Sequence, residues 1–477
     1  MLRGLGWASV LALGSIGCAA EDARSAADGK DGSSCTVFAH ADGSAAIVCD
    51  DGTTAEVRPG QAGASCVVVD NLDGTKTIRC GDGTEVTVKD GVDGVTCTLT
   101  SNGDGSKTLR CGDGTEAVIV PPPADGVLDG SYQVVNSMDA MLLAGYVRVS
   151  GDLIVRDTAM ADLVLAELTR VDGDLIVENN PTLKSVSMPA LVSVGGSVSV
   201  AGNAALVHLP ALPRLLEVGG SLSVEENAAL VDLAGVAALT DVGADLFVAL
   251  DPRLATLAGL SALTTVGGSV TLFGNAALTT LQEPAQLIAV GGALVIGQNP
   301  VLRDLAGLAS VATIGQWLAI SNNEALENVD GLASLSAVGG ELSLYNNDSL
   351  ASVTGLSSLA SIGSHVIVNG NAQLPSLAGL GGIATLGGYL FVRGNPSLGS
   401  LGGLANLSAV EGYVTVSENR ALVELGLASL VSVGGATITL TDNVLLPTCD
   451  ATGLLAQLTG YAGTVTISGN NDAGMCP

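Results

Sequence analysis

The sequence predicts an all-β protein, a parallel β-solenoid of 24-residue leucine-rich coils preceded by small disulfide-stapled β-hairpin repeats. Three observations predict this fold: one Asn recurs every 24 residues, three Cys pairs share one spacing, and the composition is aliphatic. Hydrophobic residues make up 47% of the 477 residues and aromatic residues only 3%, with 64 Gly. This composition suits a core of Leu, Val and Ile between frequent turns.

A single Asn marks each coil of the long array, which begins near residue 145. The Asn positions are 24 residues apart after a first step of 23, and Asp251 fills the one gap. A Leu stands three residues after each position, from Leu183 to Leu446. The repeated residues are Asn180, Asn203, Asn227, Asn275, Asn299, Asn323, Asn347, Asn371, Asn395, Asn419 and Asn443, and Asn470 follows after 27 residues. Self-similarity at a fixed period is the signature of a solenoid.

Each unit reads approximately G-G-x-L-x-[VIL]-x-x-N-x-x-L-x-x-L-x-G-L. A coil of this length is too short for a helical hairpin, and the Val, Ile and Thr of the L-x-V segment favour strand. We expect these segments to stack into one parallel sheet around a triangular core, with the Gly-Gly pair at a corner of unusual φ and ψ. The Asn lies where the chain leaves the sheet. We expect it to point inward and to pair with buried backbone N–H and C=O groups.

This pattern resembles the leucine-rich repeats of receptor L-domains, the ligand-binding solenoids of insulin and EGF receptors that also occur in bacterial surface proteins. The resemblance covers residues 145 to 477. It implies a right-handed parallel β-solenoid and a binding or adhesive role, without naming the ligand. Two features depart from the family: the array has about thirteen coils, roughly twice the number in a receptor domain, and no Cys-rich module divides it.

Three copies of a 31-residue unit precede the array. The pairs Cys35/Cys49, Cys66/Cys80 and Cys97/Cys111 are each separated by 14 residues, with an Asp-Gly midway. Alternating Thr, Val and Ile flank these sites, which predicts β-hairpins whose two Cys face each other across the strands. A disulfide would stabilise so small a module by about 3 kcal/mol. The Asp- and Asn-rich loops leave calcium binding as an alternative to plain turns.

The N-terminus predicts an export signal. Arg3 precedes an apolar run of about 14 residues, which is too short to span a membrane. The run ends at Cys18 in a segment that resembles the lipobox of bacterial lipoproteins, although Ser15 stands where that family usually has Leu. The resemblance implies lipidation of Cys18 and, because Ala19 follows, anchoring in the outer membrane, either surface-exposed or facing the periplasm. An ordinary signal peptide with an incidental Cys is the alternative.

Removing Cys18 from the nine Cys leaves eight, an even number that suits disulfides in an exported chain. The last two, Cys449 and Cys476, bracket a short predicted helix and are expected to pair in a cap on the final coil. The predicted segments are a signal peptide at 1–17, a linker at 18–29, hairpin repeats at 30–117, a Pro-rich linker at 118–129 and the solenoid at 130–477. Residues 130–145 are expected to form a cap at its start.

The outward positions of x-L-x-V-x carry seven of the chain's twelve aromatic residues, which are four Phe, six Tyr and two Trp. Alternation along a strand turns Leu and Val inward and these positions outward. The ligand-face candidates, with Asn369 beside them, are Phe247, Phe273, Trp317, Tyr345, His365, Tyr389, Phe391, Arg393 and Tyr413. Such a face suits contact with a surface protein or a glycan. The alternative is a ladder of rings that only stabilises the strands.

The remaining signals argue against catalysis, cofactors and nucleic acid. A balance of 18 Lys and Arg against 47 Asp and Glu gives a net charge of −29, which repels phosphate backbones. His40, His208 and His365 lie in unrelated contexts without a metal or nucleophile motif. We expect a non-catalytic binding or adhesion module with no cofactor and no metal, which contacts the membrane through its lipid alone. The alternatives are a passive spacer or coat component and, second, a polysaccharide-acting enzyme, although we expect no Asp or Glu ladder on the sheet.

Overall fold

The computed structural model describes residues 125–474 apart from residue 144, and before them the backbone of nine strands between residues 35 and 119. The side chains of residues 138, 141 and 142 lie outside this description. The chain divides into two compact units, Met1–Leu128 with Met138–Arg148 and Asp129–Ser137 with Val149–Pro477. The predicted signal peptide, Cys18 and the 18–29 linker lie outside the described residues.

The N-terminal unit contains three similar antiparallel meanders. In each meander the first two strands place the paired Cys directly opposite each other, as with Cys66 and Cys80. This is the predicted backbone register, while the disulfides themselves stay a prediction because these side chains are not described. The hairpin prediction is incomplete, since a third strand follows each hairpin. The strands are β1 (Cys35–Ala39), β2 (Ala45–Cys49), β3 (Thr54–Val57), β4 (Cys66–Asp70), β5 (Thr75–Cys80), β6 (Glu85–Lys89), β7 (Cys97–Ser101), β8 (Lys107–Cys111) and β9 (Glu116–Ile119).

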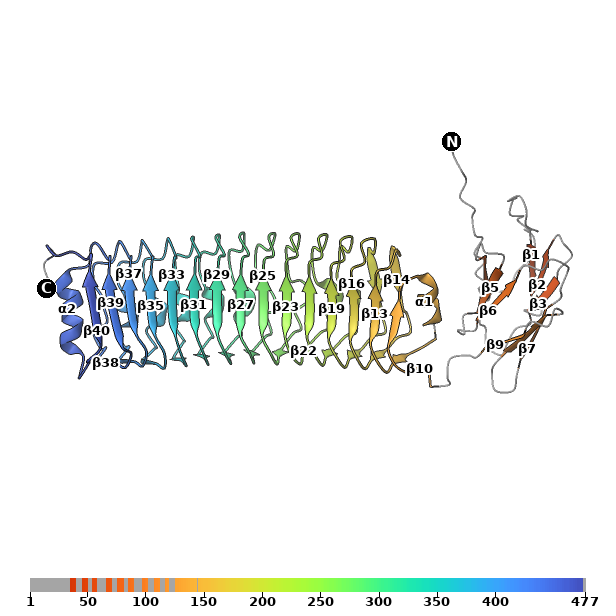
Figure 1. Cartoon of the computed structure of the whole chain (residues 1–477), viewed down its shortest axis with the longest axis horizontal. Coiled ribbons are helices and arrows are strands. Elements are labelled where there is room, and N and C mark those ends of the chain that lie inside the picture. Colours follow the sequence, from red (N-terminus) through yellow and green to blue (C-terminus); the bar gives the residue numbers. More distant parts are fainter. Residues whose placement is uncertain are drawn as a thin grey trace, which may run out of the picture. The chain divides into compact units, whose positions relative to one another are not determined.

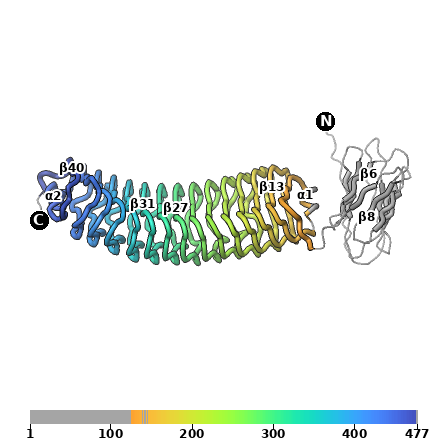
Figure 2. Tube along the Cα trace, turned by 60° about the horizontal axis from the view of Figure 1, so that its bottom comes forward, coloured from red at the N-terminus to blue at the C-terminus, as the bar shows by residue number. Residues whose placement is uncertain are grey.

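The second unit is a parallel β-solenoid with one long sheet along its length, as the sequence predicts (Figure 1). Its coils stack into a gently curved rod (Figure 2). The 15 strands of this long sheet, in order, are β11 (Tyr132–Val134), β13 (Leu153–Arg156), β16 (Leu175–Glu178), β19 (Val198–Ala201), β21 (Leu222–Glu225), β23 (Leu246–Ala249), β25 (Val270–Phe273), β27 (Leu294–Gly297), β29 (Leu318–Ser321), β31 (Leu342–Tyr345), β33 (Val366–Asn369), β35 (Leu390–Arg393), β37 (Val414–Ser417), β39 (Thr437–Thr441) and β40 (Thr464–Ser468).

The expectation of a single sheet is too simple, because a second side of each coil forms a parallel sheet of its own. Its two-residue strands are β15 (Arg170–Val171), β18 (Ser193–Val194), β20 (Glu217–Val218), β22 (Asp241–Val242), β24 (Thr265–Val266), β26 (Ala289–Val290), β28 (Thr313–Ile314), β30 (Ala337–Val338), β32 (Ser361–Ile362), β34 (Thr385–Leu386), β36 (Ala409–Val410) and β38 (Ser432–Val433). Two further strands of this sheet, β10 (Val127–Leu128) and β12 (Arg148–Val149), come before them in the sequence.

The third side of the coils is made of short 3-10 turns, after a pair of short strands in the first coils. The strands are β14 (Asp162–Val164) and β17 (Ser185–Ser187), and the turns are η1 (Ala234–Val236), η2 (Ala306–Leu308), η3 (Asp330–Leu332), η4 (Thr354–Leu356), η5 (Ala378–Leu380) and η6 (Gly402–Leu404). The Gly of the x-G-L motif lies here. At Gly379, for example, an added Cβ would collide with the carbonyl oxygen of Val353 in the preceding coil. Close approach of successive coils therefore requires this glycine.

Alternate residues of the long strands fill the core. In β31, Leu342 and Leu344 are fully buried while Ser343 between them faces outward and is half-buried. The register places Leu342 opposite Leu318 and Val366 of the neighbouring coils. Each fully buried Leu or Val side chain stabilises the fold by roughly 1.5–3 kcal/mol. Stability therefore accrues coil by coil through contacts between neighbours.

A residue with a left-handed backbone follows the long strand of each coil. One residue there has a φ between 50° and 72° in every coil from β13 onward, and we call this the turn position: Asp157, Asn179, Gly202, Glu226, Leu250, Gly274, Gln298, Asn322, Asn346, Gly370, Gly394, Glu418, Asp442 and Gly469. The Gly-Gly pairs do not have such angles, so the predicted unusual φ at that corner is wrong. They instead allow close packing, because a Cβ at Gly219 would collide with the carbonyl oxygen of Gly195.

The two ends of the solenoid differ from its middle. At the start, β11 already belongs to the long sheet, and the helix α1 (Ser137–Leu142) follows it in the sequence, so the cap expected at 130–145 stays a prediction. At the far end, the predicted helix is present as α2 (Thr448–Gln457), which buries Ala451 and Leu454. Cys449 is disulfide-bonded. Its expected partner, Cys476, lies outside the described residues, so the pairing stays a prediction.

None of the helices in the described residues combines the length and the apolar character that a membrane span requires.

Candidate binding face and its supporting ladders

The Asn of each coil points into the core, as the sequence predicts. Asn180, Asn203, Asn227, Asn275, Asn299, Asn323, Asn347, Asn371, Asn395, Asn419 and Asn443 are 0% exposed, and Asn470 in the last coil is half-buried. Asn347 shows the shared geometry. Its Oδ1 accepts the backbone N–H of Asn323 at 3.2 Å, and its Nδ2 donates to the carbonyl of Ile320 at 2.9 Å. We call this column the Asn ladder, and its role is to pair backbone groups inside the solenoid.

Asp251 is the exception in the Asn ladder and is equally buried. Its Oδ1 accepts the N–H of Asn227 at 2.7 Å, and its own N–H donates to Asn275 Oδ1 at 3.2 Å. A carboxylate has no counterpart to the amide Nδ2, and Asp251 Oδ2 has no hydrogen-bond partner. Burial raises the pKa of Asp251 to about 6, and the carboxylates of Glu225 and Glu226 act in the same direction.

A second ladder is formed by the residues that directly precede the long strands. We call this column of residues the edge column. In its first half a side-chain oxygen accepts a backbone N–H of the next coil, as when Ser221 Oγ accepts the N–H of Asp245 at 3.2 Å. The acceptors are Ser131, Asp152, Asp174, Ser197, Ser221, Asp245 and Ser269. The sequence shows them as a Ser or Asp directly before the strand, a signal that the prediction missed. The expectation that the sheet carries no acidic ladder is therefore wrong for Asp152, Asp174 and Asp245. Each of these carboxylates binds a backbone N–H.

The edge column changes character in its second half. After Ser269 it continues through Ala293, Trp317, Glu341, His365, Tyr389 and Tyr413. Three of the seven predicted outward aromatic residues, Trp317, Tyr389 and Tyr413, therefore belong to this column. Phe247 and Phe391 lie at the middle outward position of their strands, and Phe273 and Tyr345 at the end. None of the seven is buried, and all are on the long sheet or at its border.

Three rings of the edge column stack on one another. The ring centroids of His365 and Tyr389 are 3.8 Å apart, and those of Tyr389 and Tyr413 are 4.5 Å apart at an interplanar angle of 7°. His365 also has the acceptor role found in the first half of the edge column, because its Nδ1 accepts the N–H of Tyr389 at 3.0 Å. Burial raises the pKa of Tyr389, helped by the negative charge of Glu341. For these rings the stabilising-ladder explanation accounts for the contacts.

Trp317 and Tyr345 have no such explanation. They are 45% and 40% exposed, and in the described residues neither makes a stacked contact with another ring. They lie in adjacent coils at opposite ends of the strand, and Tyr345 pairs in register with Ser321. The outward residues between them, Ala319 and Ser343, are small. Two large exposed rings therefore flank a floor of small side chains.

Charged and polar groups lie on the same side of the later coils. Arg393 at the end of β35 donates to Glu418 at 2.6 Å, an exposed ion pair that raises the pKa of the guanidinium. Asn369 pairs in register with Arg393 and with Tyr345. An exposed pair of this kind contributes at most about 1 kcal/mol to stability. The Arg393 head group is therefore available to a partner at little cost to the fold.

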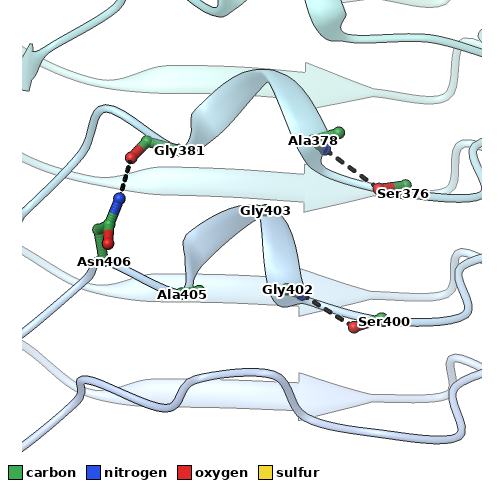
Figure 3. Close-up of a pocket in the computed structure, with 8 residues that line it drawn as sticks. All are labelled: Ser376, Ala378, Gly381, Ser400, Gly402, Gly403, Ala405 and Asn406. Carbon is green, nitrogen blue, oxygen red and sulfur yellow. Dashed lines mark hydrogen bonds between the residues drawn. The ribbon is translucent and has the colours of Figure 1, made fainter.

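A shallow hollow of about 320 Å³ lies on the 3-10 side of the solenoid, beside η5 and η6 (Figure 3). Its polar groups are already used. Ser376 and Ser400 accept the N–H groups of Ala378 and Gly402, and Asn406 donates to the carbonyl of Gly381 at 2.8 Å. The rest of its lining is Gly and Ala. This side therefore offers a ligand few anchoring groups.

In the residues that the structure describes, no three His, Cys, Asp or Glu side chains lie close enough together to hold a metal ion. No protein-family model matches the chain, and no curated protein matches it significantly. The function is therefore inferred from the chain's own surface.

Proposed function

We propose that this chain is an exported, lipid-anchored binding module that contacts a cell-surface protein or a glycan through the outer face of its long sheet. It performs no catalysis. Its solenoid serves as a rigid scaffold, and the second half of the sheet face supplies the contacts. The likeness to receptor L-domain repeats, which also bind ligands on a solenoid surface, supports the same role.

The observation that carries this proposal is the exposure of Trp317 and Tyr345. Exposed Trp and Tyr side chains are the residues that most often dominate binding interfaces, because each buries a large area with little loss of conformational entropy. The fold does not require them, since Ala293 and Ser321 occupy the equivalent positions one coil earlier in the solenoid. A passive spacer accounts for the stacked rings of His365, Tyr389 and Tyr413, but it gives no reason for Trp317 and Tyr345.

The test changes Trp317 and Tyr345 together to Ser and measures attachment of the purified chain to partner cells and to a glycan array. We expect attachment to fall by about tenfold or more, as for loss of interface hot spots. Thermal unfolding should be unchanged, whereas Tyr389→Ser, which removes the middle of the ring stack, should lower the midpoint by a few degrees, about 1 kcal/mol. Ile288, 58% exposed beside β26, provides the matched control as Ile288→Ser. Attachment that survives the double change contradicts the proposal.

The anchor is a separate part of the proposal and has its own measurement. The lipobox-like segment ending at Cys18 supports diacylation of that Cys after signal cleavage. Cells expressing the chain and fed a radioactive fatty acid should label it, and Cys18→Ser should abolish the label. A wild-type chain without label would mean a freely secreted protein.

A further inference from the structure

Three apolar side chains in two adjacent coils lie in the first half of the solenoid, apart from Trp317, at or directly after the outward positions of the long sheet. Phe247 is at the middle of β23, Leu250 is at the turn position after it, and Phe273 ends β25. The register pairs Phe247 with Thr271, and Ala249 with Phe273, so the three side chains belong to two adjacent coils. We call them the apolar cluster.

Leu250 is the member that the fold explains least. It has a φ of 57° and is 45% exposed. Every other turn position carries Gly, Asn, Asp, Glu or Gln. A bulky apolar residue is disfavoured both in the left-handed region and in water. The strain together with the exposure points to a contact outside the chain.

Small residues make room for the cluster. A Cβ at Gly274 would meet Leu250 Cδ2 at 2.7 Å, and a Cβ at Gly297 would meet the Phe273 ring at 3.0 Å. Ala249 is only 1% exposed. Leu250 and Phe273 thus lie over the backbone of the next coil, which leaves an apolar surface outward.

Acidic residues border the cluster on the side of the preceding coil. Glu225 pairs in register with Ala249, and the N–H of the exposed Glu226 donates to the Ala249 carbonyl at 3.2 Å. None of the ion pairs in the described residues involves either carboxylate. Two carboxylates therefore stand beside an apolar surface without a basic partner, on a chain with a net charge of −29.

We propose that the apolar cluster, bordered by Glu225 and Glu226, binds a protein segment that presents an apolar side chain next to Lys or Arg. The inference rests on the proposed function, because it uses the same sheet face, and it adds the class of partner. A glycan fits the apolar cluster poorly, because Phe247, Leu250 and Phe273 have no hydrogen-bonding group in their side chains and the bordering carboxylates favour a cationic group. A basic and apolar segment matches both the uncovered surface and its charged border.

The experiment pans a phage library of random peptides of about 12 residues against the full chain and against Leu250→Asn. Asn occupies this position in three coils, as Asn179, Asn322 and Asn346, and its short polar side chain tolerates the left-handed region better than Leu does. The wild type should enrich peptides that place Leu, Ile, Phe or Trp beside Lys or Arg. A synthetic peptide of that consensus should bind Leu250→Asn and Phe273→Ser about tenfold more weakly, and Glu225→Gln with Glu226→Gln should remove most of the salt dependence of binding.

A stability measurement separates binding from folding. If Leu250 serves a contact, Leu250→Asn should keep or raise the thermal midpoint while it weakens peptide binding. A consensus without basic residues, no consensus at all, or equal affinity for the variant would overturn the inference. Self-association of the wild type that Leu250→Asn abolishes would also overturn it, by identifying a second copy of the chain as the occupant.

The two proposals fail in different ways. The double change of Trp317 and Tyr345 should leave peptide binding intact, and so should Ile288→Ser. Absence of a peptide consensus alongside a loss of cell or glycan attachment in the double variant overturns this inference alone. Attachment that survives the double change overturns the proposed function.

Discussion

The Asn ladder and the edge column run along the same solenoid, yet they differ in how strictly their residues repeat. The Asn ladder keeps one side chain in every coil from Asn180 to Asn443, apart from Asp251, and each side chain is fully buried. The edge column begins with Ser and Asp acceptors and then turns to Trp, His and Tyr. Both columns accept backbone N–H groups in the first half of the array.

Access to water explains the difference. An N–H group in the core has no partner except the one that a side chain supplies, so each coil must supply it. At the border of the sheet, water can replace a lost Ser or Asp oxygen at little cost. The edge column is therefore free to exchange an acceptor for a ring. One residue in which it does so, Trp317, belongs to the proposed binding face.

Asn347→Leu tests the Asn ladder and should cause the largest loss of folding stability. It leaves the Asn323 N–H and the Ile320 carbonyl without their partners in the core. At roughly 1 to 3 kcal/mol for each unpaired group, the loss is about 2 to 6 kcal/mol. Urea unfolding followed by circular dichroism would measure it. Ser343→Leu, an outward change in the same coil, should cost far less, and equal effects for the two variants would refute the assigned role.

Asp251→Asn tests the exception and should stabilise the chain at neutral pH. By the 27-residue spacing of the neighbouring Asn bonds, the new Nδ2 would reach the carbonyl of Val224. The pKa of Asp251 rises from 3.8 to about 6 on folding, so the folded state favours the protonated acid. The resulting stability is fully present below pH 3.8 and is lost as the pH rises through 6. The loss at pH 7.5 is at most roughly 3 kcal/mol.

Thermal midpoints of the wild type and Asp251→Asn between pH 4 and pH 7.5 would measure this. The gap between the two proteins should be small near pH 4, grow as the pH rises from about 4 to about 6, and level off above pH 6. Because Glu225 and Glu226 also act on Asp251, changing both to Gln should shrink the pH dependence in part. A constant gap across the pH range would show that folding does not raise the pKa of Asp251.

Much of the fold could be predicted because the same pattern recurs in every repeat of the sequence. The Asn spacing and the buried Leu that follows it give the coil length, the stacking and the inward Asn. The Cys spacing gives the hairpin register of β4 and β5 in the N-terminal unit. In each case the pattern within one repeat is enough to predict the structure, because each repeat packs against a neighbour of similar sequence.

Other features depend on the tertiary structure. The sequence predicts an unusual φ at the Gly-Gly pairs, but these pairs serve close packing against the previous coil, and the left-handed residue follows the long strand. The acceptor role of Ser221 and Asp245 was missed, since a Ser or Asp before a strand has many possible partners. The seven outward aromatic residues also look alike in sequence, yet Tyr389 and Tyr413 stack, whereas Trp317 stacks on no other ring among the described residues.

The sequence by itself determined the period of the coil, the side chains that fill it and the outward position of the rings. These follow from alternation and repetition, which are properties of neighbours along the chain. Only the tertiary structure decided which rings stack on one another, that Leu250 is strained and exposed, and that Asp251 Oδ2 lacks a hydrogen-bond partner. Those properties depend on contacts between residues about 24 positions apart, whose distances and angles the one-dimensional pattern does not contain.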